Sequence, residues 1–140
     1  YDEACKKYGV DELDYDEEEA MSRELGTCTF LSHFPHRTHP FWNMKQNDDD
    51  KNLYNKIDVI MHGQETIGSA ERATNVDEMR ENFHTISDGE YAQILYKHFT
   101  KERVEKELEE YLSHDFFPRF GGGIGVTRMV RAMEMSGLLK

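Results

Sequence analysis

The stretch KIDVIMHGQETIGSAER, residues 56–72, decides the fold. Its two halves, residues 56–61 and 64–70, are short runs of β-type sequence that flank the dipeptide His62-Gly63. A dipeptide ending in glycine between two such runs is typical of the turn of a β-hairpin. The stretch therefore predicts two neighbouring antiparallel strands. The pairs predicted across them are Met61 with Gln64, Ile60 with Glu65, and Asp58 with Ile67.

Segments on both sides of this hairpin add one more strand and several helices. Residues 27–34 (TCTFLSHF) are rich in β-branched and aromatic residues, which favours a strand. Asn75, Asp88 and Thr100 are candidate caps at the starts of three helices. Because helices and hairpins do not alternate as strand–helix units, the order predicts an α+β fold with an antiparallel sheet. Helices are expected over residues 2–8, 17–25, 75–82, 89–99, 101–112 and 128–139.

The composition indicates one domain, or part of one, with a modest core. The chain has 140 residues, of which 37% are hydrophobic and 32% charged, and its net charge is −11. This acidity argues against a nucleic-acid platform, since phosphate contacts come mostly from Lys and Arg. No run approaches the roughly 20 apolar residues of a membrane span, so a cytoplasmic protein is expected. The chain begins at Tyr1, which suggests a fragment or a processed product, and Cys5 and Cys28 are expected to be reduced.

Two carboxylates of the hairpin form a candidate magnesium site. In the predicted register, Asp58 and Glu65 project from one face on diagonal positions, which lie about 7–8 Å apart. Magnesium commonly takes one or two carboxylates together with substrate phosphates. The alternative is two acids on a solvated sheet face. Arg72 would fall on the opposite face unless a bulge, for which Gly68 is a candidate, re-aims it toward a carboxylate ligand.

A glycine-rich segment precedes the last helix. Gly121, Gly122, Gly123 and Gly125 lead to Arg128, which can reach a phosphate from the first turn of the helix. The segment lacks the Lys-Ser/Thr pair of a P-loop and the strand-plus-acid pattern of a dinucleotide fingerprint. Nucleotide binding and a purely structural glycine run both remain open from this segment taken alone.

Three segments together resemble one family. GGGIGVTRMV, residues 121–130, is similar to the third signature motif of class II aminoacyl-tRNA synthetases, a glycine-rich strand and helix with an ATP-contacting arginine. Residues 57–72 resemble the segment before that motif in the aspartate, asparagine and lysine subgroup. Residues 33–45 (HFPHRTHPFWNMK) resemble the Pro-Phe-aromatic segment of aspartyl and asparaginyl enzymes. The resemblance covers about residues 30–139 and implies the C-terminal part of a class II catalytic domain.

The resemblance implies an ATP- and magnesium-dependent ligase that activates aspartate or asparagine as an adenylate. In it Asp58 and Glu65 would hold magnesium-ATP, and Arg72 would hold the amino-acid side chain in a pocket shaped by Gly68 and Ser69. Arg128 would bind the phosphates, with Gly123 and Gly125 making room for the nucleotide. Glu65 and Arg128 would thus be the residues closest to catalysis. The full protein would be a homodimer that contacts tRNA through regions outside this chain.

Several features depart from the tRNA-charging pattern. Thr127 stands where that subgroup commonly has an acidic residue before the motif arginine, and it is reminiscent of ammonia-dependent asparagine synthetase, which shares the fold. The first and second signature motifs and an anticodon-binding barrel are not found in these 140 residues. The chain alone is therefore not expected to catalyse adenylation. Asparagine synthesis from the adenylate and a non-catalytic binding or assembly module remain the alternatives.

Overall fold

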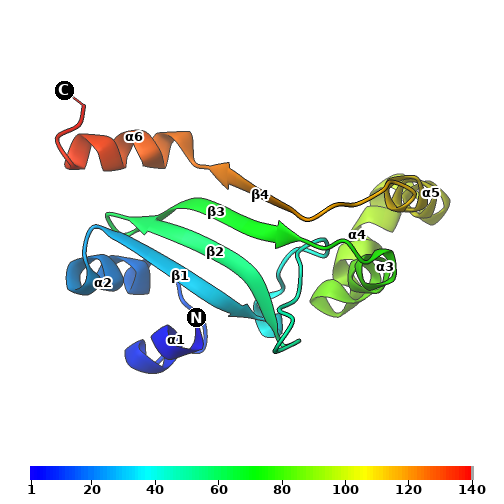
Figure 1. Ribbon diagram of the computed structural model, residues 1–140, viewed down its shortest axis with the longest axis horizontal. Helices are drawn as coiled ribbons and strands as arrows, with labels where there is room; N and C mark the ends of the chain where they lie inside the picture. The colour runs from blue at the N-terminus through cyan, green and yellow to red at the C-terminus, as the bar shows by residue number, and fades with distance from the viewer. Residues whose placement is uncertain (140) are drawn as a thin grey trace.

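A computed structural model describes residues 1–139, which build an antiparallel sheet flanked by helices (Figure 1). Within these residues the sheet has the strand order β1-β2-β3-β4, and each neighbouring pair is antiparallel. The predicted α+β class is therefore confirmed. The strands are β1 (Cys28–Pro35), β2 (Leu53–Met61), β3 (Gln64–Arg72) and β4 (Arg119–Ile124).

The β2–β3 hairpin turns at the predicted dipeptide but contains a bulge that the sequence did not locate. His62 and Gly63 both have positive φ, 47° and 78°, as a tight hairpin turn requires. Ile60 pairs with Glu65 as predicted, but Val59 pairs with Ile67, which leaves Thr66 as an extra residue. The predicted pair of Asp58 with Ile67 is wrong, because Asp58 pairs with Gly68. One extra residue reverses the alternation of faces along β3 beyond this point.

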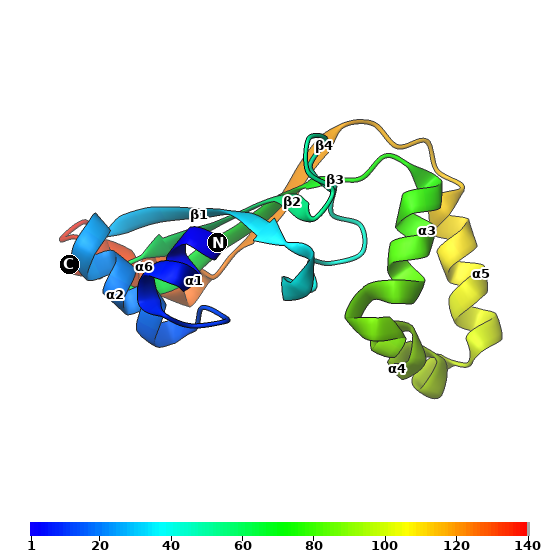
Figure 2. The same cartoon turned by 90° about the horizontal axis from the view of Figure 1, so that it is seen from below.

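The helices form two groups at opposite ends of the sheet (Figures 1 and 2). Near the β2–β3 turn lie α2 (Tyr15–Leu25) and α6 (Val126–Met135), and α1 (Asp2–Tyr8) packs beside β1. At the other end α3 (Val76–Thr85), α4 (Glu90–Phe99) and α5 (Lys101–Leu112) pack together. We call α3, α4 and α5 the helical unit. No helix within residues 1–139 has the length and apolar character needed to cross a membrane.

Two of the three predicted capping residues cap their helices. The Asn75 side chain accepts hydrogen bonds from the N–H groups of Asp77 and Glu78, and Thr100 caps α5, both as predicted. Asp88 does not cap α4, contrary to the prediction, because it lies with a left-handed backbone inside the 3₁₀ segment η2 (Ile86–Gly89). Gly89 precedes α4 without a side-chain cap. α2 begins earlier than predicted, since Asp14 forms its capping box.

The largest hydrophobic cluster lies in the helical unit. Trp42, from the connection between β1 and β2, inserts there and makes edge contacts with the rings of Phe83 and Tyr111. Its partners are buried residues of all three helices. The sheet buries Phe34, Tyr54 and Ile60 but leaves Phe30 and Phe120 69% and 80% exposed. The helical unit therefore has a hydrophobic core of its own. Within residues 1–139, the two faces of the sheet are not both covered by other elements.

The glycine-rich segment is a strand and not a loop. Gly121, Gly122 and Gly123 pair with Ala70, Ser69 and Gly68 of β3. A Cβ at Gly122 would lie 2.6 Å from the Gly68 carbonyl oxygen, so glycine is needed there for the strands to pair. The helix that follows spans residues 126–135, which is shorter than the predicted 128–139.

Candidate functional site

Asp58 carries a buried carboxylate that is only half satisfied. The residue is 6% exposed on β2, and Lys56 Nζ contacts its Oδ2 atom. Its Oδ1 atom has no hydrogen-bond partner among residues 1–139. Burial raises the pKa of Asp58, Lys56 opposes this rise, and the nearby Glu65 charge adds to it. An unpartnered buried carboxylate oxygen costs stability, which is typical of a binding position.

Glu65 lies on the same face as Asp58, because it pairs with Ile60, which is two residues from Asp58 on β2. A Cβ built at Gly68 would lie 2.8 Å from Glu65 Oε1 and 3.3 Å from Asp58 Oδ1. Both carboxylates therefore converge over this glycine on one face of the sheet. They also line one cavity of about 290 Å³ between the sheet, α2 and the connection after β1. The two carboxylates share this face in the predicted register and in the observed one.

Arg72 lies on the same face, farther along β3. Its NH1 group donates to Asn43 Oδ1 at 3.2 Å, and its NH2 group donates to the Gly121 carbonyl at 3.1 Å. A Cβ at Gly121 would come within 2.9 Å of Arg72 Nε, so this glycine gives the guanidinium its room. The bulge that re-aims Arg72 is at Thr66, not at Gly68. Asn43 was not singled out in the sequence because nothing in its local pattern marks it.

Arg128 projects from the first turn of α6 to the edge of the site. Its NH1 group donates to the Glu65 carbonyl at 2.6 Å, and its side chain passes 3.3 Å from a Cβ position at Gly125. A Cβ at Gly123 would meet no atom within 4 Å, so this glycine borders open space. Ser69 is not brought to this face, because strand alternation turns it away from Gly68. Its hydroxyl donates to the Ile57 carbonyl at 3.5 Å.

A third acid, Glu18 of α2, also borders this cavity. Its Oε2 atom accepts a hydrogen bond of 2.8 Å from the Glu65 N–H. Burial raises the pKa of Glu18; the bond from Glu65 opposes the rise, and the Glu65 and Asp58 charges reinforce it. Glu18 could not be distinguished in the sequence, because it is one of seven acids among residues 11–19, a pattern that usually marks solvated surface. Only its contact with the sheet distinguishes it from its neighbours.

The antiparallel sheet with its flanking helices has the fold of a class II synthetase core. The family described as tRNA synthetases class II (D, K and N) matches residues 1–137, and the chain belongs to it. Two curated relatives are the lysine–tRNA ligase of Psychrobacter cryohalolentis and the aspartate–tRNA(Asp/Asn) ligase of Haloquadratum walsbyi. They are 23% identical over 124 residues and 25% identical over 127 residues, each covering 88% of this chain. The matches cover 23% and 25% of those proteins, so the chain spans about a quarter of their length.

Solved structures show the same fold. The asparaginyl-tRNA synthetase of Entamoeba histolytica in complex with asparaginyl-adenylate superposes with a TM-score of 0.71 at 21% identity, over 98% of this chain and 31% of that one. The Pyrococcus horikoshii asparaginyl-tRNA synthetase with the same adenylate gives 0.70 at 22% identity, over 94% and 30%. The aspartyl enzyme of E. histolytica gives 0.66 at 22% identity, over 94% and 27%. The resemblance to aspartyl and asparaginyl synthetases is thus confirmed at the level of fold.

Proposed function

We propose that this chain forms the ATP- and amino-acid-binding part of a ligase core that activates aspartate or asparagine as an adenylate. The observation that carries the proposal is the convergence of Asp58 and Glu65 over Gly68, with one oxygen of Asp58 buried and unpartnered. Two of the similar solved structures are complexes with asparaginyl-adenylate, which supports this reaction. In the longer protein, residues 1–140 would be the C-terminal part of the catalytic domain.

The two carboxylates fit magnesium-ATP. Hard oxygen donors in a pair, open to a cavity, match the one or two carboxylates that magnesium takes beside substrate phosphates. Asp58 and Glu65 both line this cavity, and the unpartnered Asp58 Oδ1 and Glu65 Oε1 lie 3.3 and 2.8 Å from the Cβ position of Gly68. When bound, magnesium would neutralise the charge of the phosphates. Lys56 holds the second oxygen of Asp58 and so fixes the direction of the first.

Two arginines would bind the two ends of the adenylate. Arg72 is held in place by Asn43 and Gly121, and its guanidinium suits a carboxylate or amide at the end of the amino-acid side chain. Arg128 stands beside Glu65, where it would bind the ATP phosphates, and Gly123 leaves open space for the nucleotide. In these assignments Gly68 leaves the space in which the two carboxylates approach each other. Ser69 would act only through the backbone of β3.

The reaction would require positioning more than proton transfer. An oxygen of the amino-acid carboxylate attacks the α-phosphorus of ATP, a new P–O bond forms, and the bond to pyrophosphate breaks. No side chain needs to form a covalent bond, since alignment and charge neutralisation lower the barrier. The groups of this chain supply binding and charge on one side of the substrates. The remaining contacts, the homodimer interface, any tRNA contact and a cytoplasmic location belong to the proposal for the whole protein.

One residue favours a second acceptor. Thr127 precedes Arg128 where tRNA-charging members of this subgroup commonly carry an acid. This departure supports transfer of the aspartyl group to ammonia, with asparagine as the product, as the second candidate. Both candidates share the adenylate and differ only in what attacks it.

Amino-acid-dependent ATP–pyrophosphate exchange with the complete protein tests the proposal. We expect exchange with aspartate or asparagine and none with lysine, since Arg72 would repel the lysine ammonium group. Product analysis with tRNA or ammonium then separates the two acceptors. Absence of exchange with all three amino acids at saturating ATP would instead support a module that keeps the fold without the chemistry.

A further inference from the structure

The main chain of Glu65 pairs with Ile60 of β2 on one side, but β4 does not reach it on the other side. β4 pairs with β3 only from Ile67 to Arg72, so this pairing ends two residues short of Glu65. The bulge at Thr66 interrupts the regular β2–β3 register beside it. Strand pairing on the β4 side therefore does not fix the orientation of the Glu65 peptide. This is the residue whose carboxylate has to face Asp58.

Two side chains from different helices bond the Glu65 main chain instead. The N–H donates to Glu18 Oε2 of α2 at 2.8 Å, and the carbonyl accepts from Arg128 NH1 of α6 at 2.6 Å. The Thr66 carbonyl also accepts the Gly125 N–H at 2.8 Å. α2 is itself anchored against the hairpin, because a Cβ at Gly63 would lie 3.0 Å from Glu19 Cα. The Glu65 peptide is thus bonded on both sides by groups outside the sheet.

The negative charge of Glu18 does not favour stability at this position. The side chain is partly buried, and burial and the carboxylates of Glu65 and Asp58 disfavour its ionised form more than the Arg128 charge favours it, so its pKa is raised. A neutral acceptor such as Gln would make the same bond to the N–H without this repulsion. No three His, Cys, Asp or Glu side chains within residues 1–139 are grouped closely enough to hold a metal together. Glu18 is therefore placed to act through Glu65 and not as a third ligand.

We propose that Glu18 is a positioning residue for the magnesium-ATP site: its carboxylate fixes the Glu65 peptide at the bulge, so that the Glu65 side chain faces Asp58 across Gly68. This inference rests on the proposed function, because it assigns a role to Glu18 through the carboxylate pair. The negative charge of Glu18 also adds to the field that attracts a divalent cation into the cavity. The bond and the charge have separable effects.

Three variants of the complete protein separate these effects. Glu18→Ala removes the bond and the charge, Glu18→Gln keeps an acceptor oxygen and removes the charge, and Glu19→Ala removes a neighbouring α2 carboxylate that pairs with Arg23. We expect Glu18→Ala to raise the magnesium concentration for half-maximal pyrophosphate exchange about 10- to 100-fold, the usual effect of losing an outer partner of a metal ligand. The KM for the amino acid should stay unchanged. Glu18→Gln should recover most of this loss, and Glu19→Ala should match the wild type.

A direct binding measurement makes the inference independent of turnover. Mn²⁺ titration followed by electron paramagnetic resonance, in the presence of a non-hydrolysable ATP analogue, should show the same order of affinities. If wild-type protein exchanges pyrophosphate but Glu18→Ala and Glu19→Ala have equal magnesium dependence and equal Mn²⁺ affinity, Glu18 has no positioning role. If no protein exchanges pyrophosphate, the proposed function fails, and the Mn²⁺ affinities of the variants alone decide the role of Glu18.

Discussion

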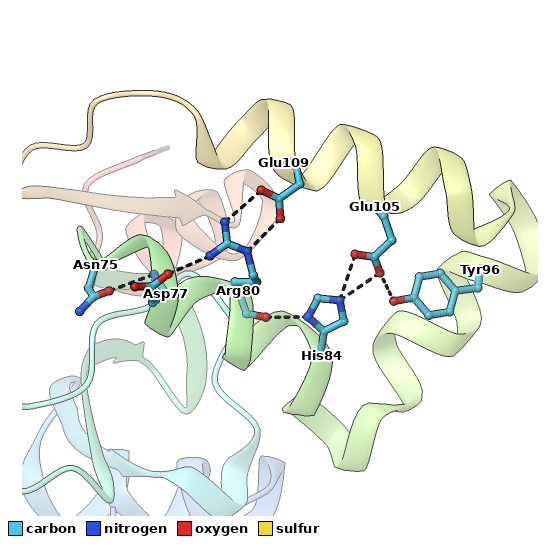
Figure 3. A network of polar contacts seen from close by, with 7 residues as sticks. All are labelled: Asn75, Asp77, Arg80, His84, Tyr96, Glu105 and Glu109. Carbon is cyan, nitrogen blue, oxygen red and sulfur yellow. Dashed lines mark hydrogen bonds and ion pairs between the residues drawn. The ribbon is translucent and has the colours of Figure 1, made fainter.

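The helical unit and the sheet-borne site differ in whether their acidic side chains have hydrogen-bond donors as partners. In the helical unit, acids meet donors: Glu109 accepts two bonds from Arg80, and Glu105 accepts from His84 and Tyr96 (Figure 3). On the sheet, Asp58 and Glu65 face each other, and one oxygen of Asp58 has no partner among residues 1–139. Satisfied charges support a structure, whereas crowded like charges are retained where a ligand needs them. We therefore propose that the helical unit serves mainly stability and the sheet-borne carboxylates serve ligand binding.

The largest expected effect on stability comes from the core of the helical unit. Phe83 is 4% exposed and packs edge-on against Trp42 and Tyr91. Phe83→Ala should lower the free energy of unfolding by about 3–5 kcal/mol, since it removes a buried ring and leaves a cavity. Chemical denaturation followed by circular dichroism measures this loss.

The matched variant is Phe120→Ala, on the open face of the sheet. Because Phe120 is 80% exposed, its removal should change the free energy of unfolding by no more than about 0.5 kcal/mol. Equal losses for the two variants would show that the sheet face is covered in the complete protein, and the contrast between the two regions would then not hold.

The charges of the site should matter for activity and not for stability. Glu65→Gln removes one of the two facing carboxylate charges while keeping the side-chain shape. We expect pyrophosphate exchange to fall by at least about 100-fold, as when a preorganised charge partner of the transition state is lost. The free energy of unfolding should stay within about 0.5 kcal/mol of the wild type. Glu81→Gln, an exposed acid of α3, is the control and should change neither quantity.

Two glycines of β4 should separate the amino-acid and nucleotide ends of the site. A methyl group at Gly121 would press on Arg72 Nε, whereas one at Gly123 would occupy open space. Gly121→Ala should raise the KM for the amino acid about 10- to 100-fold, since small displacements of a binding group are costly. Gly123→Ala should raise the KM for ATP instead. Steady-state exchange kinetics distinguish the two, and identical profiles would contradict the proposed division of the site.

The polar network of the helical unit should give the smallest effect, a dependence of stability on pH. Burial and the bond to Glu105 raise the pKa of Tyr96 to about 12. A raised pKa means that this stabilisation is complete below pH 10 and is lost as the pH rises toward 12. Burial opposes ionisation of Glu105, but bonds from Tyr96 and His84 outweigh it and lower the pKa. That stabilisation is complete above pH 4.5 and is lost as the pH falls further.

Urea denaturation across the pH range checks this dependence. We expect the alkaline limb to be worth about 1 kcal/mol after allowance for solvent screening of the partly exposed Tyr96, and the acid limb to lower the free energy of unfolding as the pH falls below 4.5. Tyr96→Phe should flatten the alkaline limb. An alkaline limb that persists unchanged in this variant would assign the effect to another tyrosine.

Much of the fold followed from local sequence patterns. The alternation in residues 56–61 and the turn at His62-Gly63 predicted the hairpin, and Asn75 and Thr100 marked true helix starts. Asp88 failed as a cap because the chain needs left-handed residues between α3 and α4, a demand set by how these helices pack. Local signals predict an element, but tertiary packing sets where it ends.

The site was less predictable because its geometry depends on one extra residue. Thr66 carries no mark of a bulge, yet the bulge turns Arg72 to the face that Asp58 and Glu65 share. Glu18 has the same letter as its acidic neighbours, and only the packing of α2 on the hairpin distinguishes it. The motif resemblance supplied Asp58, Glu65, Arg72 and Arg128 as candidates, and their roles stay predictions. Their mutual placement required the three-dimensional structure.

Pyrophosphate exchange by Asp58→Asn, measured over a range of magnesium concentrations with the complete protein, tests the central claim most directly. If the Asp58 and Glu65 pair binds magnesium-ATP, exchange should fall at least about 100-fold at the magnesium concentration that saturates the wild type. Exchange at the wild-type rate with wild-type magnesium dependence would contradict the claim.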